Sequence, residues 1–211
     1  MLINKYKVKQ YKNYHFYSHY SLSNYDLEQI CCSILSPQKL EQGVLGGRGS
    51  MRRIFLPKWG NVILKHYRRG GILGPLIRSF YIKDGKPFRP QIEFEMLQFL
   101  KEQNVNVPIP LAFIIKGKKI YKGWLVSMLI ENHKNMAQIA IENPLRIKKN
   151  VEKVALLINK LIDLRVYHVD LHPGNVVLDD NEQAYLLDFD KAYFFQGPSQ
   201  KLKNYYIYRW Q

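Results

Sequence analysis

The sequence predicts an α+β fold in which a small antiparallel sheet with one main helix precedes a shorter, mainly helical part. Strand-like runs rich in β-branched and aromatic residues alternate with glycine and proline turns in the first part. Apolar residues recur at helical spacing after residue 150. A chain of 211 residues with 46% apolar content can form two small lobes. We expect an N-lobe at residues 1–131 and a reduced C-lobe at residues 132–211.

The N-lobe begins with residues 1–25, where no period is clear, so we expect an irregular or loosely strand-like segment. Residues 26–35 have helical spacing and precede Pro37, which favours a short helix. A glycine cluster at 46–49 and the run "NVILKHY" after Gly60 predict a hairpin with a glycine-rich tip. A helix is predicted from residue 89 until "NVNVPIP", and strands at 111–115 and 124–130 complete the small sheet.

The C-lobe is predicted to start with a helix from Asn150, which leads into a polar loop. "NVVLDD" and "AYLLDFD" then predict two short strands around the turn "DDNEQ". The residues expected to face the core of the helix are Val151, Val154, Ala155, Ile158, Leu161 and Ile162.

The charge of the chain favours a polyanionic partner. Lys and Arg total 32 against 17 Asp and Glu, a formal charge of +15. Nucleic acid, a nucleotide or an acidic membrane surface would each fit. Residues 48–89 contain eleven Lys or Arg, and Asp84 is the only acid among them. This stretch is a candidate anion-facing patch, and the alternative is an ordinary solvated face.

Cysteine use and hydropathy indicate a reducing compartment. Cys31 and Cys32 are neighbours, cannot form an ordinary disulfide with each other and are too few for a metal cage. No stretch approaches eighteen apolar residues, and Lys and Asn interrupt the N-terminus where a signal peptide would have an apolar core. We therefore expect a cytoplasmic protein that does not span a membrane.

The stretch "YHVDLHPGNVVLDD", residues 167–180, carries the most specific chemistry. Asp170 and Asn175 lie five residues apart, and Asp188 follows thirteen residues later at the end of a second apolar strand. This is the spacing of a kinase catalytic loop followed by its metal-binding turn. A zinc cage would need more His or Cys. We interpret His168 as a structural histidine that holds the loop, and His172 as a loop residue.

Phosphoryl transfer requires these residue types. Asp170 can accept the proton of the attacking hydroxyl, which makes it the candidate catalytic base. Asn175 and Asp188 offer the hard oxygen atoms that Mg²⁺ prefers, so they are the candidate metal ligands.

Partners for ATP occur upstream in the required order. A glycine cluster could let backbone N–H groups approach the phosphates. Its members are Gly46, Gly47 and Gly49. Lys65 ends a strand in "VILK", where its ammonium could pair with the α- and β-phosphates. Glu93 should edge the buried face of the following helix and reach Lys65, with Glu95 as second choice. Each feature alone has an ordinary structural explanation, but their order together predicts a kinase-like, two-lobed fold.

The segments "GGRGS", "VILKHYRRGGILGPLIRSFYI", "IEFEMLQFL", "VPIP" and "HVDLHPGN...LLDFD" together resemble the Kdo (3-deoxy-D-manno-octulosonic acid) kinases of the lipopolysaccharide kinase family. The most specific segment is "HYRRGG", directly after Lys65. The resemblance runs from about Gly46 to the end of the chain.

The resemblance implies a peripheral enzyme on the cytoplasmic side of the Gram-negative inner membrane, which uses ATP and Mg²⁺ to phosphorylate the 4-hydroxyl of Kdo in Kdo-lipid A. It also implies an adenine-binding hinge at Ser127 to Ile130, with Met128 and Ile130 as contacts. Arg68 and Arg69 are candidates to meet acidic lipid or the Kdo carboxylate. No nucleic-acid partner is expected.

Two other functions are considered. "DLHPGN" equally resembles aminoglycoside-type small-molecule phosphotransferases. A basic nucleic-acid-binding protein with a decayed kinase fold would lack the interleaved aromatic and basic motif it needs, and would leave Asp170, Asn175 and Asp188 unexplained. Because only 23 residues follow Asp188, a small-molecule or lipid-linked hydroxyl is expected rather than a protein acceptor.

Overall fold

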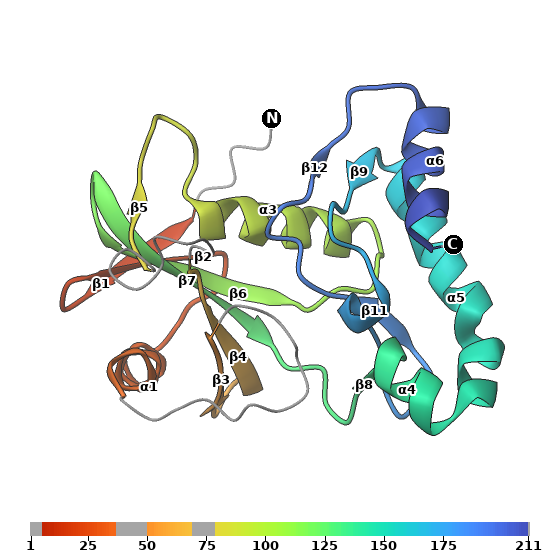
Figure 1. Cartoon of the computed structure of the whole chain (residues 1–211). Coiled ribbons are helices and arrows are strands. Elements are labelled where there is room, and N and C mark those ends of the chain that lie inside the picture. Colours follow the sequence, from red (N-terminus) through yellow and green to blue (C-terminus); the bar gives the residue numbers. More distant parts are fainter. Residues whose placement is uncertain (1–5, 37–49, 69–78, 211) are drawn as a thin grey trace. The chain divides into compact units, whose positions relative to one another are not determined.

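The computed structural model describes residues 6–36, 50–68 and 79–210, which fall into two compact units (Figure 1). The first unit contains the described residues up to Phe94 together with Ile109–Leu129. The second contains Glu95–Pro108 and the described residues from Ile130 onward. The fold is α+β with an antiparallel sheet, as the sequence predicted. The predicted boundary between lobes after residue 131 stays a prediction.

The first unit is built on a seven-stranded sheet in which every neighbouring pair is antiparallel. Six strands follow the order β1-β2-β6-β7-β4-β3, and β5 pairs with β7. The strands are β1 (Lys7–Tyr11), β2 (Tyr14–Ser18), β3 (Ser50–Leu56), β4 (Gly60–His66), β5 (Tyr81–Ile82), β6 (Pro110–Gly117) and β7 (Ile120–Met128). The two strands predicted at 111–115 and 124–130 are therefore present as β6 and β7.

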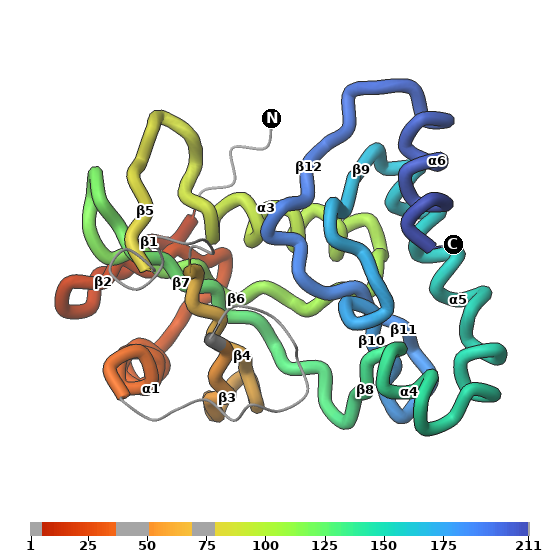
Figure 2. The backbone as a smooth tube through the Cα atoms, in the orientation of Figure 1, coloured from red at the N-terminus to blue at the C-terminus, as the bar shows by residue number. Residues whose placement is uncertain are grey.

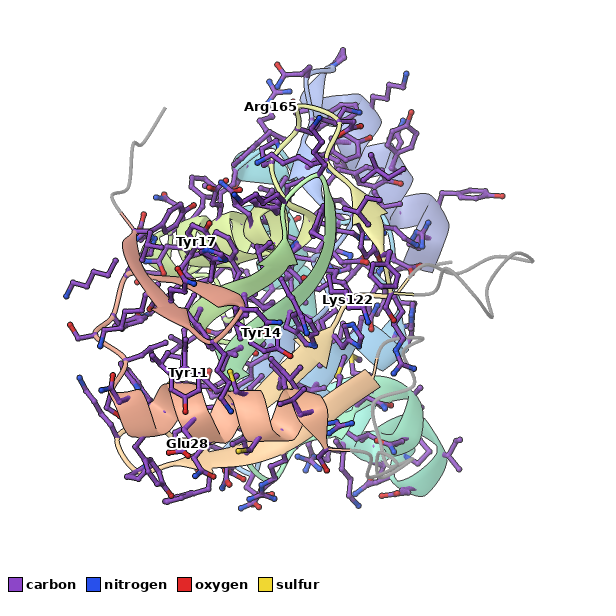
Figure 3. All side chains as sticks on the ribbon, turned by 90° about the vertical axis from the view of Figure 1, so that its left-hand side faces the viewer. Tyr11, Tyr14, Tyr17, Glu28, Lys122 and Arg165 are labelled. Atoms are coloured by element: carbon purple, nitrogen blue, oxygen red, sulfur yellow. The ribbon has the colours of Figure 1, made fainter. Side chains whose placement is uncertain are left out.

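The N-terminal segment is more regular than the sequence indicated. Residues 7–18 form the β1–β2 hairpin (Figure 2), so of the two alternatives given for this segment the strand-like one is confirmed and the irregular one is wrong. Tyr14 and Phe16 on β2 are buried, whereas Tyr17 points to the opposite face and stacks on Phe113 with ring centres 4.6 Å apart. Figure 3 shows Tyr11 and Tyr14 towards helix α1 and Tyr17 farther from it. The alternation in "YHFYS" is the period of a half-buried strand.

Helix α1 (Asn24–Leu35) covers the face of the sheet that Tyr14 and Phe16 occupy. It begins with a capping box, since Ser23 and Asp26 each accept a hydrogen bond from the other's backbone N–H. Leu27 and Ile30 then lie on the buried side of the helix. Cys31 is buried and Cys32 is exposed, and neither forms a disulfide, as predicted.

Two hairpins of the sheet have different turns. Pro57–Trp59 connects β3 to β4, and the glycines predicted at the tip lie outside the described residues. Gly117 at the end of β6 has a φ of +103°, and a Cβ there would lie 2.2 Å from the Ile120 carbonyl oxygen. Only glycine fits this turn, which sets the register of β6 against β7.

The second unit is mainly helical, with two small antiparallel sheets of order β11-β10-β8 and β12-β9. Its elements from residue 134 are β8 (Lys134–Asn135), α4 (Met136–Glu142), α5 (Pro144–Asp163), β9 (Val166–Tyr167), the 3-10 helix η1 (Pro173–Asn175), β10 (Val176–Leu178), β11 (Ala184–Leu186), β12 (Tyr193–Phe194) and α6 (Ser199–Trp210). The strands predicted around "DDNEQ" are present as β10 and β11. Across the ranges described, no helix is long and apolar enough to cross a membrane.

Helices α3 and α5 differ in how well the sequence located them. The helix predicted from residue 89 is α3 (Arg89–Glu102). Helix α5 begins six residues earlier than predicted, because the Asn143 side chain caps it and Pro144 fits its first turn. Its buried residues are Asn150, Val154, Leu157 and Leu161. Val151 and Ala155, both expected to face the core, are exposed.

We expect His66 to make the protein less stable in acid. Burial is the main cause that lowers its pKa from 6.5 to about 4, and the nearby cations Arg68, Lys122 and Arg52 lower it further. The unfolded chain therefore binds a proton that the folded chain does not. The free energy of unfolding should fall as pH drops from about 6.5 to 4, by at most about 1.4 kcal/mol per pH unit for one proton.

Urea unfolding at several pH values tests this prediction in a His66→Phe variant, which keeps a ring to stack on Trp124. The variant should lose stability less steeply over this window than the parent protein. His15→Phe on β2 is the control for the change of a histidine to phenylalanine in another strand of the sheet. Equal slopes for the parent and His66→Phe would contradict the assignment.

Candidate active site

The first unit holds a buried ion pair between the predicted lysine and glutamate. Lys65 Nζ lies 2.9 Å from Glu93 Oε1 and 2.8 Å from Oε2. Their side chains are 12% and 3% exposed, so the pair is largely removed from water. Strand β4 presents Lys65, and α3 presents Glu93 one turn before the buried Leu97. The contact predicted from the sequence is present, and the role of both residues in nucleotide binding stays a prediction.

Tyr67 is a third member of this cluster that the sequence analysis did not identify. It is buried and its hydroxyl donates a hydrogen bond to Glu93 Oε2. Lys65 Nζ lies 5.2 Å from the centre of its ring. The signal was available, because residues two apart in an extended chain point to the same side, and Tyr67 follows Lys65 by two. The carboxylate of Glu93 is thus held from two directions.

In the second unit, His168 attaches the predicted catalytic loop to the strand before Asp188. His168 is buried, and its Nε2 lies 2.8 Å from the Leu187 carbonyl oxygen. A carbonyl only accepts, so Nε2 carries the proton and donates. Burial is the main cause that lowers the pKa of His168. A neutral, buried and hydrogen-bonded imidazole has the structural role that the sequence predicted.

Tyr206 of α6 holds the same loop from the other side. Its hydroxyl accepts a hydrogen bond from the His168 backbone N–H at 2.8 Å and donates one to the Val166 carbonyl at 2.9 Å. The side chain is buried, and burial raises the pKa of its hydroxyl. No local sequence pattern predicts this contact, since the partners are 38 and 40 residues apart.

Asn175 brings the predicted base and the predicted metal ligands into one network. Its Nδ2 donates to the Asp170 carbonyl at 2.8 Å, and its own carbonyl accepts from the Leu187 N–H at 2.9 Å. The next residue, Asp188, has a φ of 63°. A left-handed backbone is uncommon outside glycine, and such residues concentrate at functional sites. Asn175 therefore connects the backbone of Asp170 to the backbone of Leu187, the residue before Asp188.

Among the described residues, two cations face the Asp170 carboxylate. Arg209 Nη1 lies 3.4 Å from Oδ1, and Lys191 Nζ lies 3.9 Å from Oδ2. Neither residue was predicted to belong to the site. Both are distant from Asp170 in the sequence, and only the tertiary structure brings α6 and the turn of Lys191 to the loop.

The oxygen donors of this network suit Mg²⁺ better than a transition metal. With its Nδ2 committed as a donor, Asn175 would offer its amide oxygen, and Asp188 would offer its carboxylate. No three His, Cys, Asp or Glu side chains gather into a metal cluster anywhere in the part of the chain that the structure describes. Two protein oxygens are enough for Mg²⁺ when substrate phosphates complete its shell. The magnesium assignment stays a prediction.

The remaining predicted site residues are the hinge and the glycines. The Met128 N–H donates to the Ile109 carbonyl at 2.9 Å. The Ile130 carbonyl contacts His133 Nδ1. The role of Met128 and Ile130 in adenine binding stays a prediction. The glycine cluster and one predicted arginine lie outside the described residues. They are Gly46, Gly47, Gly49 and Arg69.

Comparison with known proteins identifies relatives over most of the chain. Residues 44–203 match the Lipopolysaccharide kinase (Kdo/WaaP) family. The chain is 34% identical over 181 residues to the 3-deoxy-D-manno-octulosonic acid kinase of Vibrio cholerae serotype O1, covering 82% of this chain and 75% of that protein. The enzyme of the same name from Vibrio vulnificus strain YJ016 is 33% identical over 164 residues, which are 77% and 69% of the two chains. That of Haemophilus influenzae strain PittGG is 34% identical over 178 residues, or 79% and 73%.

We expect Tyr67→Phe to loosen the Lys65–Glu93 pair without removing it. The variant loses the hydroxyl that donates to Glu93 and keeps the ring beside Lys65. A hydrogen bond to a charged group contributes about 1.5–3 kcal/mol, so the free energy of unfolding should fall by about that amount in urea. Tyr208→Phe is the matched control, since Tyr208 is 84% exposed and should tolerate the change. Equal stability of the two variants would exclude the hydroxyl as a support for Glu93.

Proposed function

Because the chain belongs to the lipopolysaccharide kinase (Kdo/WaaP) family, we propose that it is a kinase that phosphorylates the 4-hydroxyl of Kdo in Kdo-lipid A, with ATP as the phosphate donor. The reaction is a step in the assembly of the lipopolysaccharide core. The observation that carries the proposal is the Asn175 network, which connects the loop of Asp170 to Leu187, between the end of β11 and Asp188. It supports the proposal because phosphoryl transfer needs a base and metal ligands held near one another.

Each predicted site residue would have a separate role in the transfer. Lys65, held by Glu93, would pair with the phosphates of ATP, and the hinge at Met128 and Ile130 would meet the adenine. Asp170 would accept the proton of the acceptor hydroxyl, because its carboxylate is half-exposed and can be reached by a substrate. Mg²⁺ at Asn175 and Asp188 would supply positive charge to the phosphate oxygens.

An aminoglycoside-type phosphotransferase is the alternative enzyme, since it would use the same loop on a soluble acceptor. The family match and the relatives named Kdo kinase favour the lipid-linked acceptor. A nucleic-acid-binding pseudokinase is less consistent with the site, because the fixed loop and the strained backbone of Asp188 would then have no role.

We expect the purified protein to transfer labelled phosphate from ATP to Kdo-lipid A and not to lipid A that lacks Kdo. Removal of Mg²⁺ with EDTA should stop transfer, and its addition should restore it. Asp170→Asn should lower kcat by about 10²- to 10⁴-fold, the range for loss of a general base, and leave ATP binding intact. Asp180→Asn, an exposed position in the β10–β11 turn, is the matched control. Transfer to an aminoglycoside instead, or full activity of Asp170→Asn, would refute the proposal.

We also propose that the protein binds the cytoplasmic face of the inner membrane as a peripheral protein. An apolar tip on the first unit supports this placement. Its members are Phe80, Ile82 and Ile120, all exposed, and neighbouring lysines are Lys83, Lys119 and Lys122. Ile82 pairs with Ile120 across β5 and β7, and the Lys83 N–H donates to the Lys119 carbonyl at 2.9 Å. Apolar side chains among lysines suit an anionic bilayer surface.

Binding to vesicles tests the membrane proposal. The protein should sediment with vesicles containing phosphatidylglycerol more than with phosphatidylcholine alone, and rising salt should release it, because each lysine near the surface contributes about 1 kcal/mol. Ile82→Asn combined with Ile120→Asn should weaken binding, whereas the control Val8→Asn, an exposed apolar position on β1, should not. Equal binding of all three proteins would place the membrane contact elsewhere.

A further inference from the structure

Two cations from separate segments lie beside the carboxylate of the proposed catalytic base. The backbone that carries each of them is held by a buried aromatic residue nearby. Arg209 lies one helical turn after Tyr206, whose buried hydroxyl bonds the backbone on both sides of Tyr167. Lys191 lies two residues after Phe189, which is fully buried with its ring centre 4.5 Å from that of His168. The Ala192 N–H donates to the Phe189 carbonyl and closes the turn around Lys191. A buried aromatic residue near each cation, Tyr206 for Arg209 and Phe189 for Lys191, therefore contacts the proposed catalytic loop and fixes the backbone that carries the cation.

The contacts of these cations with Asp170 do little for folding. The side chains of Arg209, Lys191 and Asp170 are 34%, 55% and 47% exposed, and ion pairs in such positions contribute little to stability. The separations of 3.4 and 3.9 Å are also longer than a charge-assisted hydrogen bond of about 2.7–2.9 Å. A guanidinium carries five N–H donors and an ammonium three, so both can receive a second anion beside Asp170.

The proposed acceptor has such an anion. Kdo is a sugar acid, and its carboxylate is ionised at neutral pH. An anionic acceptor that brings a hydroxyl to Asp170 would be repelled by the base itself unless positive charge stands beside it. Of the residues that the structure describes, Arg209 and Lys191 face the Asp170 carboxylate. Resting on the proposed function, we propose that Arg209, assisted by Lys191, binds the carboxylate of the acceptor sugar acid and so places its hydroxyl at Asp170.

Under this assignment, helix α6 carries the residue that selects acceptors with a carboxylate. Arg209 lies beyond residues 44–203, the part of the chain that matches the family. Arginine also suits the task chemically, because its planar fork can bind a carboxylate through two parallel hydrogen bonds. An acceptor without a carboxylate would lose these bonds and gain no others at this position.

The test combines variants with two acceptors, Kdo-lipid A and the same lipid with the Kdo carboxylate converted to a primary amide. The parent protein should lose about 10- to 100-fold in kcat/KM on the amide, mainly through the acceptor KM, the range for loss of a charge-assisted bond pair. Arg209→Gln should lose about as much on the acid and nothing further on the amide. Arg209→Lys should recover part of the loss on the acid. The KM for ATP should not change in either variant.

Two controls make the result specific. Lys203→Gln makes the same change of charge on an exposed position of α6 and should behave as the parent protein. Arg68→Gln tests one of the two arginines that the sequence predicted to meet the carboxylate, and it should still discriminate between the acid and the amide. Equal melting temperatures of Arg209→Gln and Lys203→Gln would exclude misfolding as the cause.

The opposite outcomes each overturn the inference. An equal loss on both acceptors, a raised KM for ATP or a faster Arg209→Gln would show that Arg209 acts on the phosphate or merely restrains Asp170. Abolished discrimination in Arg68→Gln would move the subsite to that residue. Efficient transfer by the parent protein to acid and amide alike would refute the subsite alone, whereas no transfer to either would refute the proposed function and the subsite with it.

Discussion

The hydrogen bond from His168 Nε2 to the Leu187 carbonyl is the constraint on which the proposed catalytic centre depends. It joins the start of the catalytic loop to the strand that delivers Asp188, so two segments nineteen residues apart share one buried contact. Burial lowers the pKa of the imidazole and so favours its neutral form, which donates to the carbonyl from Nε2. If this contact were lost, the loop of Asp170 would lose one of its two connections to Leu187, the residue before Asp188, and the hydrogen bond of Asn175 would remain.

The surroundings of His168 extend this constraint to the rest of the second unit. Phe189 packs against the ring of His168, and the Tyr206 hydroxyl accepts a hydrogen bond from its backbone N–H. Later in the same loop, the Asn175 carbonyl accepts a hydrogen bond from the Leu187 N–H. Each of these groups is buried or bonded to backbone, where an unpaired polar atom would be costly. The site is therefore rigid where it holds the loop and open where the Asp170 carboxylate meets solvent.

In the first unit, an ion pair holds the predicted site residue Lys65 in place, where the second unit uses hydrogen bonds to the backbone. The side chain of Lys65 is long and flexible, and Glu93 restricts its ammonium through two short contacts, as the proposed role in ATP binding requires. Glu93 is itself restrained by the Tyr67 hydroxyl. A buried pair of this kind adds little net stability, because desolvation offsets the attraction, but removal of one partner is costly. Such a pair is better explained by positioning than by stability.

The sequence by itself determined the α+β class, the strands β10 and β11, helix α3, the reach of Glu93 to Lys65 and the structural role of His168. These features depend on the local periodicity of apolar residues and on the spacing of residues within motifs, both of which are present in the sequence itself. The contact of Tyr67 with Glu93 had a local signal in its spacing from Lys65, which became clear only with the structure. The tertiary structure was needed to show that residues 7–18 form a hairpin, that Asn143 starts α5, and that Lys191 and Arg209 face Asp170. Arg209 is 39 residues from Asp170, and its approach depends on how α6 packs through Tyr206. No local pattern encodes such a contact, because it is decided by which buried surfaces fit together when the chain folds.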